Sequence, residues 1–149
     1  MASIREGIIS SLVTKLETIT TGNGYEQDIG TVLDFPTHFE SLDTADYPVV
    51  SIYLGNTVIS YKLGGNTADL AFNIGLRCYI EGGDEDSIRD SANKIVEDIS
   101  KMIANNITLD NSNIIKTEIV SFDPPFLWLE LGHTGICDIQ LNVVYRRNY

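Results

Sequence analysis

The residues able to carry out acid–base chemistry are few and scattered along this chain. The sequence contains two histidines and 21 acidic residues among 149 positions. His38 precedes the acids of residues 40–46, and His133 follows Glu130, so each could form a histidine–carboxylate pair of the kind that general acid–base catalysis uses. Phosphate-binding loops, nucleophile elbows and zinc-protease motifs are absent from the sequence. We therefore expect no catalytic residues and no enzymatic activity.

Metal-binding and cofactor-binding patterns are also missing. Cys78 and Cys137 form neither a CxxC pair nor any other metal-ligand spacing. The acidic tracts at 84–86 and 110–113 resemble the beginning of a calcium loop, but neither has Gly at the sixth position with an acid at the twelfth. Both cysteines occupy apolar positions of alternating stretches, so we predict that they are reduced core residues. We expect no metal, no cofactor and a cytoplasmic site of folding.

The charge balance excludes several kinds of partner. Ten Lys and Arg against 21 Asp and Glu give a net charge of −11. Such a surface repels phosphate backbones and anionic membranes, so specific nucleic-acid binding and membrane binding are disfavoured. No apolar run approaches the roughly 18–20 residues of a membrane-spanning helix. From residue 17 to residue 61 there is no Lys or Arg, which is typical either of a solvated acidic rim or of a face that lets another polyanion pass.

Two amphipathic helices frame the predicted fold. Ser3 and Glu6 form a capping box before apolar residues that recur every three or four positions up to Ile19. Asp84 begins the second helix, which has acids in its first turn and an apolar stripe that reaches Ile103. Both helices have one apolar side, so we expect each of them to cover a sheet.

Alternating apolar and polar residues predict the strands. The clearest alternation, at 68–81, is longer than a usual strand, and we expect it either to project towards a neighbour or to bend within the core. A Gly-Asn pair at 55–56 separates two further runs, which we predict to form a hairpin. Residues 36–47 are polar and acidic, and we expect a long loop there. The predicted strands are 29–35, 49–54, 57–63, 68–81, 114–122 and 137–145.

These elements predict one α+β domain over residues 1–149. We expect a mostly antiparallel sheet of four to six strands with both amphipathic helices packed on one face, in the order α-β-β-β-α-β-β.

Aromatic residues provide the candidate contact surfaces. The stretch 126–129 follows two prolines and contains the only Trp of the chain. It predicts either a sheet edge that folds under the sheet or a surface that contacts a partner, since aromatic side chains dominate interface energetics. Our candidate interface residues are Phe39, Tyr47, Tyr61, Phe126, Trp128 and Leu129.

The order of these features resembles that of bacteriophage tail terminator and minor tail proteins of the lambda type. The resemblance covers nearly the whole chain. It combines an amphipathic N-terminal helix, a Gly-Tyr segment, an early strand, a Pro-x-x-x-Ile strand, a long alternating strand and an acid-capped second helix. The residues that carry it are Ser3–Ile9, Leu16–Tyr25, Asp34–Pro36, Pro48–Ile52, Leu70–Ile80, Ala92 and Asp98–Ile99.

The resemblance implies a structural role in the virion. Proteins of this family share an α+β fold with two helices on a sheet and form a six-fold ring. The ring caps the head-proximal end of the tail tube, stops its polymerisation and presents a surface to the head–tail connector or stopper. DNA passes through the lumen without specific binding. Assembly of this kind would take place in the bacterial host cytoplasm, and the protein would end in the tail or neck of the virion.

An acidic lumen would keep passing phosphates from adhering, because like charges repel. Our candidate lumen residues are Asp34, Glu40, Asp43 and Asp46.

Three alternatives stay open from the sequence. A neck or tail-completion protein would bind the head–tail connector rather than the tube. A small-ligand-binding α+β module would contain an apolar cavity and form no ring, and an enzyme would bring titratable groups together in a pocket. Self-assembly is the property that separates these alternatives.

Overall fold

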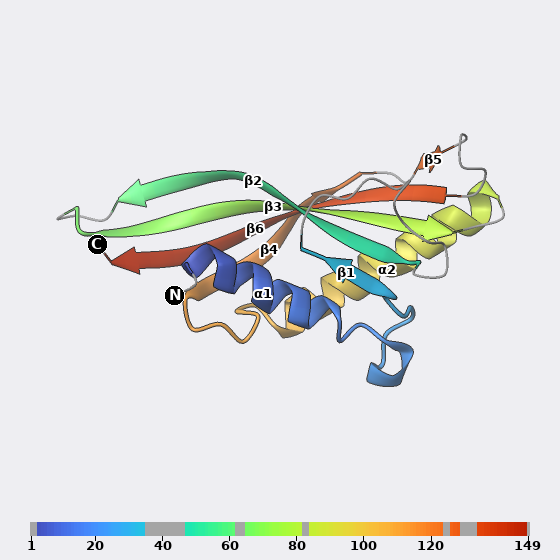
Figure 1. The fold of residues 1–149 in the computed structure, drawn as a ribbon, viewed down its shortest axis with the longest axis horizontal. Helices are drawn as coiled ribbons and strands as arrows, with labels where there is room; N and C mark the ends of the chain where they lie inside the picture. Colours follow the sequence, from blue (N-terminus) through green and yellow to red (C-terminus); the bar gives the residue numbers. More distant parts are fainter. Residues whose placement is uncertain are drawn as a thin grey trace.

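The computed structural model of this chain describes residues 3–34, 47–61, 65–81, 84–123 and 134–148, together with the backbone of 126–128. Two helices lie along one face of a long, twisted sheet (Figure 1). This arrangement confirms the predicted α+β class, the mostly antiparallel sheet and the order of the elements. The elements are α1 (Ile4–Leu16), the 3-10 turn η1 (Thr21–Asn23), β1 (Thr31–Leu33), β2 (Val49–Tyr61), β3 (Thr67–Glu81), α2 (Glu85–Asn105), β4 (Ile114–Phe122), β5 (Phe126–Trp128) and β6 (Thr134–Asn148).

Strands β3 and β6 form the centre of the sheet. They pair antiparallel over their whole length, from Thr67 opposite Asn148 to Glu81 opposite Thr134. The strand order is β1-β2-β3-β6-β4, and the short β5 also pairs with β6. Only β1 is parallel to its neighbour, which it meets at Val49–Ser51 of β2. Of the strand predicted at 29–35, the described residues form a strand at Thr31–Leu33, and residue 35 lies outside the described residues.

The predicted hairpin around residues 55–56 is wrong. Both halves belong to the single strand β2, and a bulge between Leu54 and Thr57 absorbs the Gly-Asn pair. Both halves pair with β3, because β3 is long enough to offer partners to the entire run. At the bulge, Asn73 Nδ2 donates a hydrogen bond of 2.7 Å to Asn56 Oδ1. A Cβ at Gly55 would lie 3.0 Å from the carbonyl oxygen of Asn73, so the close approach of the strands favours glycine.

The core lies between the sheet and both helices. The alternating apolar residues of β3 from Ala68 to Ile80 all face this core, as the sequence predicts. Ser3 caps α1 by accepting the N–H of Glu6 at 3.1 Å. The helix ends at Leu16, earlier than the apolar stripe suggests, but Ile19 beyond it is still fully buried. Hydrophobic burial on one side of each helix therefore holds the two layers together.

Helix α2 packs tightly against β6 at Gly135. A Cβ at Gly135 would collide with Cγ2 of Ile88, which is itself buried. Cys137 lies two residues further along β6, directly opposite Cys78 of β3. Both cysteines are buried and free, which confirms their prediction as core residues.

Candidate assembly surfaces

The sheet has a second face, turned away from the helices. Within the described ranges, no helix covers this face (Figure 1). Its residues on β3 and β6 are largely polar, and Arg77 and Asp138 stand opposite each other at its centre. Arg77 Nε donates to Asp138 Oδ1 at 2.8 Å and Arg77 Nη2 donates to Asp138 Oδ2 at 2.9 Å. This two-pronged pair joins the central strands, although 61 residues of sequence separate its members.

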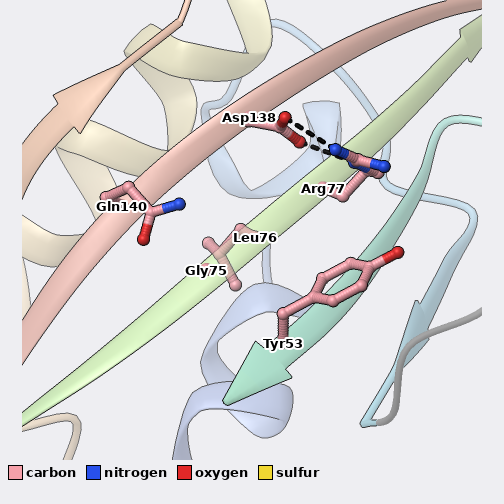
Figure 2. Close-up of a pocket in the computed structure, with 6 residues that line it drawn as sticks. All are labelled: Tyr53, Gly75, Leu76, Arg77, Asp138 and Gln140. Atoms are coloured by element: carbon pink, nitrogen blue, oxygen red, sulfur yellow. Dashed lines mark hydrogen bonds and ion pairs between the residues drawn. The ribbon is translucent and has the colours of Figure 1, made fainter. Parts of the chain in front are cut away.

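A shallow hollow lies beside this ion pair. It measures about 240 Å³ and is lined by Tyr53, Gly75, Leu76, Arg77, Asp138 and Gln140. Figure 2 shows Tyr53 and Gln140 on either side of Gly75, whose missing side chain creates the depression. The Arg77 guanidinium also lies over the Tyr53 ring, 5.5 Å from its centre. Because Arg77 and Asp138 neutralise each other, the hollow suits an uncharged group better than an anion or a cation.

Two groups on this face, Arg77 and Tyr79, have pKa values raised above their usual range. The hydrogen bond that Arg77 donates to the Asp138 carboxylate raises the pKa of Arg77 above its usual value. Burial, and then a hydrogen bond with Tyr53, raises the pKa of Tyr79. On the core side, burial raises the pKa of Cys137 to about 11 and that of Cys78 well above its usual value. All of these shifts lead away from neutral pH, whereas a general acid or base operates best near it.

The described part of the chain contains no group of three or more His, Cys, Asp or Glu residues arranged to hold a metal ion. Among the helices that the structure describes, none is long and apolar enough to span a bilayer.

The outer half of β2 exposes large apolar side chains. The exposed residues are Leu54, Val58, Ile59 and Tyr61, each with between 45% and 64% of its surface accessible. Strand β1 reaches only as far as Ser51, so within the described residues β3 is the sole strand beside residues 52–60. Strands β2, β3 and β6 also continue past the N-terminal end of α1, which leaves this end of the sheet uncovered (Figure 1). We call residues 52–60 the β2 edge.

The opposite edge of the sheet is formed by β4. Its only described partner is β6, and register shifts at Ile115 and Val120 break the pairing into short segments. Ile115, Val120 and Phe122 are exposed to between 43% and 62%. Two apolar edges therefore bound one sheet, a pattern typical of surfaces that contact other chains.

The structure describes four of the six candidate interface residues, Phe126 and Trp128 by their backbone alone. Tyr61 is exposed at the end of β2, as an interface residue would be. Tyr47 is partly buried and packs against the small apolar cluster of Val49, Tyr79 and Ile136. Phe126 and Trp128 belong to β5, whose backbone pairs with β6 at Thr134–Ile136. Phe39 and Leu129 lie outside the described residues.

Of the candidate lumen residues, only Asp34 is described, and it is exposed directly after β1. Glu40, Asp43 and Asp46 lie outside the described ranges, as do His38, Glu130 and His133.

The sequence analysis missed the other members of the exposed group on β2, namely Leu54, Val58 and Ile59. A signal for them was present, because residues 47–61 are the longest stretch of the chain without a charged residue. Edge strands usually carry a charged residue that prevents pairing with another chain, so a long uncharged strand indicates an edge that another chain covers.

The chain was compared with known families and with curated proteins. No family model matches the chain, and no curated protein matches it.

Proposed function

We propose that this chain is a structural bacteriophage protein that closes the head-proximal end of the tail tube as a ring. In this role it stops tube polymerisation and forms the surface to which the head joins. The observation that carries the proposal is the group of exposed apolar side chains on the outer half of β2. A single molecule gains nothing by leaving such a group in water, whereas a subunit of an assembly buries it.

The charge of the chain supports the same role. A net charge of −11 is unsuited to holding nucleic acid, but it suits the wall of a channel through which DNA must slide. In the proposed ring, Asp34 and the acids at 40, 43 and 46 face the lumen, and the phosphates of the passing DNA are repelled rather than bound. The partners are further copies of this chain, the tail tube protein and the head–tail connector or stopper. The protein is assembled in the host cytoplasm and is retained in the tail or neck of the virion.

The proposal is tested by measuring mass and end-capping together. Light scattering over a concentration series gives the oligomeric state, and electron microscopy of purified tail tubes mixed with the protein shows where it binds. We expect a six-fold ring, or a monomer that decorates one tube end and stops its growth. A monomer that ignores tubes at every concentration refutes the terminator role. Binding to head connectors in place of tubes would identify a neck or tail-completion protein.

A variant of the aromatic stretch gives a second test. Trp128→Ala should weaken ring formation or tube binding while the circular-dichroism spectrum stays that of the native fold. Unchanged assembly would show that Trp128 does not belong to the interface.

A further inference from the structure

We infer that neighbouring subunits of the ring join by strand addition, the β2 edge of one copy pairing antiparallel with β4 of the next. This inference rests on the proposed function and specifies the contact that builds the ring. Residues 52–60 match the nine residues of β4 in length. Each pairing would add backbone hydrogen bonds along two edges that have no second strand within the part of the chain that the structure describes.

The strand directions allow this contact, because the antiparallel order of the sheet would continue from one copy into the next. Strand β2 is antiparallel to β3, β3 to β6, and β6 to β4, so β4 runs opposite to β2. A second copy placed beside the first in the same orientation therefore brings its β4 antiparallel to β2. The helices then stay on the same side of the extended sheet. Such a contact joins two different patches, so it repeats from copy to copy and closes into a ring when the rotation allows.

Apolar side chains of β2 and β4 point to the same face of the sheet. Leu54 and Ile59 pair with core residues of β3, so they point to the helix side of the sheet. On β4, Ile119 and Phe122 pair with core residues of β6 and point to that same side. With the two strands aligned end to end, strand addition would place Leu54 beside Ile119 and Phe122. Ile59 would lie beside Ile115 at the start of β4, and both contacts would bury surface that is now exposed.

The charges favour the same contact. Two copies with a net charge of −11 each repel one another, and the β2 edge brings no charge of its own into the interface. The charges of β4 are one Lys and one Glu, and Lys116 Nζ lies 3.7 Å from Glu118 Oε2. The extra residues at the two register shifts of β4 are Ile115 and Val120. Both are apolar and exposed, whereas an edge strand that avoids pairing with other chains usually carries charged residues.

The first experiment introduces a charge on the β2 edge. Ile59→Lys is compared with Ile107→Lys, a substitution of a similarly exposed isoleucine in the turn after α2, which belongs to neither edge strand. Both variants should keep the native circular-dichroism spectrum, because both positions are open to water. We expect Ile59→Lys to raise the concentration needed for ring closure by about tenfold or more, the effect of losing one well-buried contact. We expect Ile107→Lys to assemble like the unmodified protein.

The second experiment identifies the paired strands. Ser60→Cys protein is mixed with Lys116→Cys protein and treated with a bifunctional maleimide that spans the roughly 8 Å between diagonal cross-strand neighbours. The native cysteines are buried and stay unreactive in the folded protein. Cross-links between the two variants support pairing of β2 with β4. Cross-links between two Ser60→Cys copies show a two-fold pairing of β2 with itself and overturn the inference.

The strand-addition contact and the terminator role can be refuted separately. Rings that close normally with Ile59→Lys overturn strand addition but leave the terminator role intact. Unmodified protein that neither assembles nor caps tubes overturns both.

Discussion

Asp98 connects the second helix to the segment that leads into β1, and its removal is the most informative test of how the sheet is held in place. The side chain is buried on α2. Its Oδ1 accepts the backbone N–H of Glu26 at 3.0 Å, and its Oδ2 accepts that of Gln27 at 2.8 Å. This carboxylate therefore fixes the turn that delivers β1 to the inner half of β2.

The expected loss of stability can be estimated from these two bonds. A hydrogen bond to a charged acceptor contributes about 1.5–3 kcal/mol. Glu26 is exposed and Gln27 is half-buried, so water replaces part of the loss when the carboxylate is removed. We expect Asp98→Ala to lower the free energy of unfolding by about 2–4 kcal/mol. For a chain of this size, that corresponds to a fall in Tm of roughly 5–15 °C.

The assay is chemical and thermal unfolding of three variants. Glu97→Ala is the control, because it removes the same charge from the adjacent, exposed position of α2 and should leave Tm nearly unchanged. Asp98→Asn keeps one oxygen acceptor and should fall between the two. In Asp98→Ala, the amide protons of Glu26 and Gln27 should also exchange faster with solvent. Equal stability of Asp98→Ala and Glu97→Ala would refute the assigned role.

Three further predictions follow from the packing and the charges. Gly135→Ala should lower the free energy of unfolding by about 1–3 kcal/mol because its methyl group collides with a buried isoleucine. By contrast, Gly7→Ala in the first helix should raise the free energy of unfolding by about 0.5–1 kcal/mol, because the new methyl group would lie in ordinary contact, 3.8 Å from Asn111 Nδ2. Burial raises the pKa of Cys137 to about 11, so the unfolded thiol ionises first and stability should fall as pH rises from 9 towards 11. Cys137→Ala should flatten that pH dependence of denaturant midpoints. A double-mutant cycle on Arg77 and Asp138, which are partly exposed, should give a coupling of about 1 kcal/mol or less that shrinks in about 1 M salt.

The sequence by itself determined the elements and their buried sides. Alternation at residues 68–81 marked the core side of β3, and the helical periodicity marked the apolar sides of α1 and α2. Ser3 and Asp84 marked the helix starts, and both caps are present. These features are local, because water penalises an exposed apolar stripe and an unsatisfied helix end wherever they occur along the chain.

Only the tertiary structure decided how the strands are paired and which of them are left uncovered. Residues 49–54 and 57–61 have the same alternation in a hairpin as in one bulged strand, and the length of β3 determines which of the two forms. The Arg77–Asp138 pair and the anchoring of residues 26–27 by Asp98 join positions more than 60 residues apart. Within the described residues, the β2 edge has no second neighbour because β1 ends at Leu33, and β4 pairs with β6 alone. Such pairings are non-local: a strand's own sequence shows that it needs a neighbour, but the rest of the folded chain determines which neighbour it finds.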